Sequence, residues 1–289
     1  NAGAYTTSGN MIFPLSSKAY LRLNGSATSA GNYETGSGIK PLTEYSTTDY
    51  TAILGTLLSD GSKLEFNYTN NRQDKVGYPG LNMDIVYSYT DMYTLKYHRV
   101  TPFGIFSTMN VELFNTDIDH LMDNVVLRGN TGNGVMANPT ASDTYGGRMI
   151  GTIGSDIRAG IDYEHNTKDA EQNMVMSGMN VFMTYLWPGV ETEKLGLFFE
   201  KDLNNISYGL RYDQVELDPT RAADDPGSGM MQKTANEVYT ADYDGTIVAS
   251  KRDFDNISGF LRINKDYNHG ESYINFSINE RAPDANELF

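Results

Sequence analysis

Apolar and polar residues alternate with a period of two along several stretches of the chain. In the segment NISYGLRYD (205–213), one side of an extended strand carries Ile206, Tyr208, Leu210 and Tyr212. The residues between them are polar or glycine and point to the other side, because successive side chains of a strand alternate. The same pattern recurs at 194–201, 272–279 and 107–115. It predicts strands with one apolar face and one polar face.

Short turn sequences and long polar stretches alternate between these strands. Gly, Pro, Asn and Asp mark the short turns, since these residues favour tight turns. We predict six hairpins, at about 4–31, 45–73, 86–118, 142–167, 190–218 and 253–281. We place long loops at about 32–44, 74–85, 119–141, 168–189 and 219–252. If consecutive strands are antiparallel neighbours, the short turns lie at one end of the sheet and the long loops at the other.

Two architectures have such strands: a membrane-spanning β-barrel and a soluble β-sandwich. The predicted strands run for about 10–15 residues, whereas strands of soluble proteins usually have about 5–6. The alternation of short turns and long loops is also typical of outer-membrane barrels. The pattern therefore favours an all-β, antiparallel transmembrane β-barrel of about twelve strands. In it, an outward apolar set faces lipid (Leu195, Leu197, Phe199, Leu210, Ile274, Phe276), and a polar set faces the lumen (Lys194, Arg211, Asn275).

Composition narrows the function classes. The chain has no cysteine, so a disulfide framework and Cys-based metal sites are excluded. The net charge of −15 argues against nucleic acid as a partner. No run of about 20 apolar residues is present, so no membrane-spanning helix is expected. No HExxH, GxSxG or P-loop spacing is present either, and we expect a protein that is not an enzyme and carries no cofactor.

Three short segments resemble a known family. The segment ERAPDANELF (280–289) resembles the R-x-P-x-x-x-E-L segment in the barrels of TonB-dependent outer-membrane receptors. The segments DIDHLMDN (117–124), NPTASDTYGGR (138–148) and YPGLNMDIVYS (78–88) resemble the copper-receptor branch of that family. The resemblance implies an outer-membrane location in a Gram-negative bacterium, outer-membrane lipid around the barrel, and transport driven by the TonB complex.

The resemblance also implies a longer protein. The family has a 22-stranded barrel filled by an N-terminal plug, and the plug region carries the segment that contacts TonB. Residues 1–289 supply only about twelve strands. We therefore expect a partial barrel domain, with the plug and the closing C-terminal strands missing, from a fragment or an incomplete gene product.

The segment NTDIDHLMDN (115–124) combines imidazole, thioether and carboxylate groups at a predicted strand end. Because residues two apart on a strand point the same way, His120 and Met122 can bind one ion together. Thioether sulfur suits Cu(I), and imidazole suits copper in either oxidation state. Asp119 and Asp123 would raise the local cation concentration without binding directly. The family's His-x-Met pair corresponds to these same two residues, and the resemblance implies that its other ligands lie in the plug.

Methionines are also concentrated where the loops are predicted. The segment MVMSGM adds Met174, Met176 and Met179 as candidate ligands in the loop 168–189. The sequence thus predicts a receptor that imports copper and binds it at loops bearing Met and His. Two alternatives stay open, namely a ferric-siderophore receptor and a soluble β-sandwich that binds carbohydrate or adheres to surfaces.

Overall fold

The computed structural model describes residues 3–131, 134–176, 179–229, 231–242 and 250–288 of the chain. It contains one sheet of twelve strands, which follow one another in chain order. The strands are β1 Tyr5–Pro14, β2 Ala19–Ala30, β3 Tyr45–Leu57, β4 Lys63–Val76, β5 Asp84–Arg99, β6 Thr108–Asp123, β7 Met136–Ile153, β8 Ile157–Met176, β9 Met179–Leu203, β10 Ile206–Pro219, β11 Arg252–Tyr267 and β12 Gly270–Ile278. Two helices follow strands, namely α1 (Ala235–Asp242) after β10 and α2 (Ala285–Leu288) after β12.

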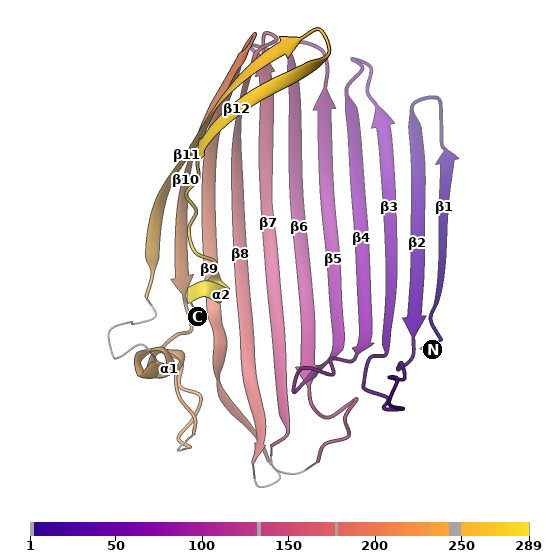
Figure 1. Cartoon of the computed structure of the whole chain (residues 1–289), viewed down its shortest axis with the longest axis vertical. Coiled ribbons are helices and arrows are strands. Elements are labelled where there is room, and N and C mark those ends of the chain that lie inside the picture. The colour runs from indigo at the N-terminus through magenta and orange to yellow at the C-terminus, as the bar shows by residue number, and fades with distance from the viewer. Residues whose placement is uncertain (1–2, 132–133, 177–178, 230, 243–249, 289) are drawn as a thin grey trace.

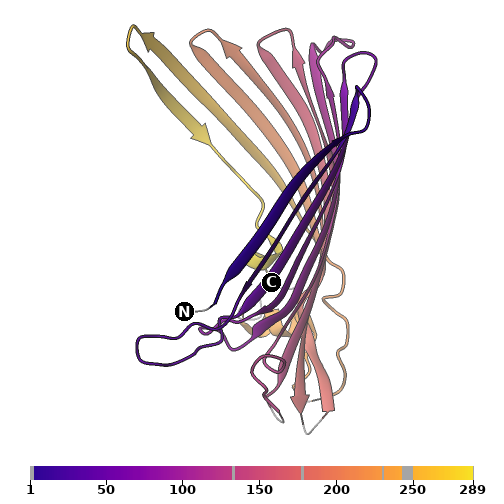
Figure 2. The ribbon, with the colours of Figure 1, turned by 90° about the vertical axis from the view of Figure 1, so that its right-hand side faces the viewer.

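Each strand pairs with its sequence neighbours in antiparallel register, so the six predicted hairpins are confirmed. Figure 1 shows the short turns together at one end of the sheet and the long connections at the other. Figure 2 shows that the sheet curves into an open trough, with a convex and a concave face. The described residues form no second sheet packed on the first, so the soluble β-sandwich alternative is wrong.

One predicted loop is wrong. The stretch 168–189 belongs to the ladder, because β8 continues to Met176 and β9 begins at Met179. The predicted loop 119–141 is likewise shortened at both ends by β6 and β7. Register shifts in the β8–β9 pair, between Lys168 and Asn173, let these long strands continue where the polar–apolar alternation is lost.

The convex face carries a band of apolar side chains. The six residues predicted to point outward are all exposed, from Leu195 and Phe199 at 39% to Leu210 at 63%. Leu54, Phe66, Leu95 and Leu113 pair in register across β3, β4, β5 and β6 on this face. Such a continuous exposed apolar band fits contact with lipid rather than water.

A row of tyrosines borders this band on the side of the long connections. Its members lie on the convex face of six strands: Tyr50, Tyr68, Tyr93, Tyr145, Tyr163 and Tyr212. Beyond the row, Asp91, Asp117 and Asp143 pair in register across β5, β6 and β7. Because tyrosine prefers the membrane interface and carboxylates avoid hydrocarbon, the row marks one boundary of the apolar band.

Glycines on the concave face make room for aromatic rings from neighbouring strands. A methyl group on Gly160 would lie 2.7 Å from the carbonyl oxygen of Met149 and even closer to the Phe198 ring. We expect Gly160→Ala to destabilise the protein by about 1–3 kcal/mol, as overpacking usually does. The measurement is the midpoint of heat unfolding in detergent.

Gly25→Ala is the matched control for this prediction. A methyl group there meets its nearest neighbour, the Tyr50 ring, at 3.5 Å, which is ordinary contact. The midpoint should stay near that of the wild type. Equal midpoints for the two variants would show that the Phe198 ring moves aside without cost.

The segment after β12 turns back over the concave face (Figure 2). Ala285 of α2 is buried with Val190 and Leu217, and Trp187 packs against them. Lys168 forms an ion pair of 3.1 Å with Asp284. The Arg281 guanidinium holds the pKa of Glu287 at about 2 through their hydrogen bonds, so this pair stays charged at neutral pH. The family-like segment is therefore docked on the wall by specific contacts.

Neither helix in the described part of the chain is long and apolar enough to cross a membrane.

Candidate metal site

His120 and Met122 lie on β6 near its C-terminal end, with both side chains on the concave face. Glu112 lies on the same side of β6 and pairs in register with Arg148, and Arg148 pairs with Asp162 of the concave wall. The even spacing from Glu112 to Met122 is unbroken in the β6–β7 register. The two predicted ligands are therefore on one face, as the sequence indicated.

The imidazole of His120 is available to a ligand. The residue is half-buried between Ser88 of β5 and Thr140 of β7, its register partners. Among the described residues, neither ring nitrogen has a hydrogen-bond partner. A neutral imidazole with a free nitrogen is the form that coordinates soft and borderline metal ions.

The carboxylates beside this pair lie on the opposite side of β6. Asp119 lies 3.4 Å from the Tyr87 hydroxyl, which donates to it, and Asp123 accepts from the backbone N–H groups of Val125 and Val126. Asp123 is buried in this role. In the described residues, no three side chains among histidine, aspartate and glutamate are grouped to hold a metal ion. A metal site here therefore depends on His120 and thioether sulfur.

The register brings a further thioether pair to the same face. Met136 and Met174 are direct partners across β7 and β8, and both are half-buried. Met136 lies two residues from Asn138, which is the register partner of Met122. Cross-strand diagonal neighbours of this kind are about 7–8 Å apart between Cα atoms. Met136 was predicted to lie in a loop, and this prediction is wrong because β7 begins at this residue.

Asn138 adds an oxygen atom to the wall beside Met122. Its side-chain oxygen is buried and has no hydrogen-bond partner among the described residues. A buried polar atom without a partner is uncommon and costs free energy unless a ligand or water satisfies it. The sequence carried no specific signal for this residue.

The rest of the methionine cluster is described only in part. Met176 and Met179 are backbone partners at the facing ends of β8 and β9, so they do not lie in a long loop. Their side chains, and Ser177 and Gly178 between them, lie outside the described residues, as does Met230. The expectation that Met176 and Met179 bind metal stays a prediction.

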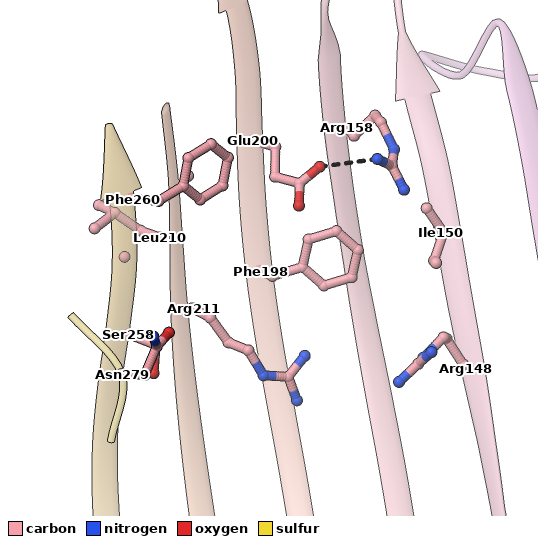
Figure 3. A pocket seen from close by; sticks show the side chains of 12 residues that line it. Arg148, Ile150, Arg158, Phe198, Glu200, Leu210, Arg211, Ser258, Phe260 and Asn279 are labelled. Atoms are coloured by element: carbon pink, nitrogen blue, oxygen red, sulfur yellow. Dashed lines mark hydrogen bonds and ion pairs between the residues drawn. The ribbon is translucent and has the colours of Figure 1, made fainter. Parts of the chain in front are cut away.

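A second cluster of charged groups lines the concave wall nearer the short turns (Figure 3). Arg148, Arg158 and Arg211 border a hollow there with Phe198 and Phe260. Arg211 binds the carboxylates of Asp162 and Asp213, and Arg158 binds Glu200 at 3.0 Å. The predicted lumen side of Arg211 is thereby confirmed. Most of these charges are neutralised by each other, so the hollow presents little net charge to a ligand.

No family model and no curated relative matches the sequence. Solved structures resemble it over nearly its whole length. The copper transporter OprC covers 99% of this chain with a TM-score of 0.78 and 19% identity. The hemophore receptor HasR of Serratia marcescens covers 98%, with a TM-score of 0.62 and 17% identity. The FrpB iron transporter of Neisseria meningitidis covers 99%, with a TM-score of 0.58 and 10% identity.

The chain spans less than half of each of these proteins, namely 45% of OprC, 45% of HasR and 46% of FrpB. Sequence identities below a fifth leave the fold as the property that is shared. The twelve antiparallel strands, the apolar convex face and the three likenesses lead to one conclusion: this chain has the fold of the TonB-dependent receptor barrels.

Proposed function

We propose that residues 1–289 form part of the barrel wall of a TonB-dependent transporter in the outer membrane. The exposed apolar band, bordered by tyrosines, supports contact with lipid over the convex face. The polar concave face suits the inner wall of a transport path. On this proposal the protein works by binding and transport rather than by catalysis, and the TonB complex is its energy-coupling partner.

We further propose that the transported ligand is copper. The observation that carries this proposal is the pair His120 and Met122 on one face of β6, with an imidazole that has no hydrogen-bond partner in the described part of the chain. Met136 and Met174 add two thioethers on the same face. Sulfur and nitrogen donors favour Cu(I), whereas Mg²⁺ and Ca²⁺ require oxygen shells. OprC, which shares this fold, is a copper transporter.

The test compares copper binding by the full-length protein and by the double variant His120→Ala/Met122→Ala. Removing a residue that only orients a metal ligand typically lowers metal affinity by about 10–100-fold. Removing two ligands should therefore lower copper affinity by at least about tenfold. Cu(I) affinity is measured by competition with a chromogenic Cu(I) chelator. Growth on limiting copper should fall in parallel.

A matched control is His98→Ala/Met92→Ala. It removes one histidine and one methionine from the same face of β5, where His98 pairs in register with Asn110 and Met92 with Thr116. Copper affinity should not change. If the site variant keeps wild-type copper affinity, the copper assignment is wrong. Ferric-chelate uptake that supports growth of the wild type would then favour the siderophore alternative.

A further inference from the structure

An ion pair between a half-buried arginine and a buried carboxylate joins the start of β5 to the connection that follows β6, beside the candidate site. Asp84, at the start of β5, is fully buried. Its carboxylate accepts hydrogen bonds from Arg128 Nε at 2.7 Å and Nη2 at 2.9 Å, and from the backbone N–H of Tyr78 at 2.8 Å. Arg128 also donates to the carbonyl oxygen of Tyr78 at 3.0 Å. We refer to Asp84 and Arg128 as the clamp.

The clamp brackets the end of β6. Asp84 precedes Ile85, and Ile85 is the register partner of Met122. Arg128 lies in the connection 124–135 that leaves β6 after Asp123. The clamp therefore ties the chain that follows Met122 back to the strand that lies next to Met122.

The other side of β6 is fixed as well. The backbone N–H of Met136 donates to the side-chain oxygen of Asn124 at 2.9 Å, and the Asn124 side chain donates to the carbonyl oxygen of Gly134 at 3.0 Å. Asn124 is buried. Both ends of the connection 124–135 are thus joined to each other, and the clamp attaches the connection to β5.

The charges of Asp84 and Arg128 favour an ion pair that persists at every physiological pH. An arginine is protonated at every physiological pH, and the hydrogen bonds with Asp84 raise the pKa of Arg128 further. A planar guanidinium that binds a carboxylate through two donors also fixes direction, which a lysine ammonium does not. Breaking such a pair leaves the Asp84 carboxylate buried without a counter-ion.

We propose that the clamp is the positioning element of the candidate copper site, although neither of its residues touches the metal. This proposal rests on the proposed function. The clamp holds the ends of β5, β6 and β7 together, so His120, Met122 and Met136 keep a fixed spacing before the metal arrives. A preorganised chelate loses less entropy on binding and releases its ion more slowly. Partners that orient metal ligands typically contribute about 10–100-fold in affinity.

The experiment measures the Cu(I) dissociation constant and the release rate of full-length wild type and Arg128→Gln. The variant should bind about tenfold more weakly and release copper correspondingly faster. Arg128→Lys keeps the charge opposite Asp84 but loses the two-donor geometry, so its affinity should be intermediate. If Arg128→Gln does not fold, Arg128→Lys provides the test instead.

Arg99→Gln is the matched control. Arg99 forms an ion pair of 2.8 Å with Asp60 and also bonds a backbone carbonyl, but it lies at the short-turn end. Its loss should lower heat stability and leave copper affinity unchanged. Wild-type affinity and release rate in Arg128→Gln and Arg128→Lys would overturn the clamp proposal alone. A wild-type protein that binds no copper would instead overturn the proposed function.

Discussion

Replacing Leu54 with arginine should prevent much of the full-length protein from inserting into lipid. Leu54 lies on the convex face of β3, between Leu21 and Phe66 in register, and is 49% exposed. If this face meets hydrocarbon, an arginine there costs about 2–4 kcal/mol near the middle of the bilayer. The folded fraction in vesicles is measured on a gel at increasing urea concentrations. A folded barrel migrates differently in unheated and heated samples, whereas unfolded protein does not.

The neighbouring residue supplies the control. Ile53 has the same size and depth on β3 but points to the concave face, where Arg22 and Asn67 are its register partners. Ile53→Arg should insert nearly as well as wild type, because its charge is exposed to a polar wall. If both variants fold equally well into vesicles, the convex face is not the lipid face.

Replacing Arg211 with methionine should destabilise the wall by about 3 kcal/mol. Arg211 donates two hydrogen bonds of 2.9 Å to Asp162 and a further one of 2.7 Å to Asp213. Both aspartates are buried, so the variant leaves two neighbouring carboxylates without their counter-ion. The expected value is the low end of the range for a broken buried pair, because Lys194 lies 4.0 Å from Asp213. Urea unfolding in vesicles measures it.

Removing the two carboxylate charges should restore most of the loss. In Arg211→Met/Asp162→Asn/Asp213→Asn, neither buried carboxylate charge remains, and Lys194, which loses Asp213 as a partner, is exposed enough to be solvated by water. Recovery of more than half of the lost free energy is the expected result. If the triple variant is no more stable than Arg211→Met, the loss came from packing of the arginine stem rather than from charge.

Most of the fold could be predicted from the sequence, because successive side chains of an extended backbone alternate between its two faces. Wherever a strand has lipid on one side and a polar wall on the other, the period-two pattern assigns each side chain to a face. This is why the exposed positions of Leu210 and Phe276 and the concave position of Arg211 could be predicted. Face assignment also placed His120 and Met122 together.

The pattern failed where the strands extend past the tyrosine row. In the stretches 136–144 and 168–176 most residues on both faces are polar, so alternation is lost although their hydrogen-bond ladder continues. The sequence therefore predicted loops where β7 and β8 are still paired. Met136 and Asn138 were missed as members of the site for this reason. The missed start of β9, NVFMTYLWPGV (180–190), lacks alternation because it is mostly apolar.

By itself, the sequence determined the twelve antiparallel strands, their two faces and the His-x-Met pair, because each follows from local spacing along one strand. Only the tertiary structure decided which strands lie beside that pair and what holds them. Met174 pairs across the sheet with Met136, which lies 38 positions earlier in the chain. The ion pair between Asp84 and Arg128 joins residues that lie 44 positions apart. Such contacts depend on register and on the path of the connections, which no local pattern encodes.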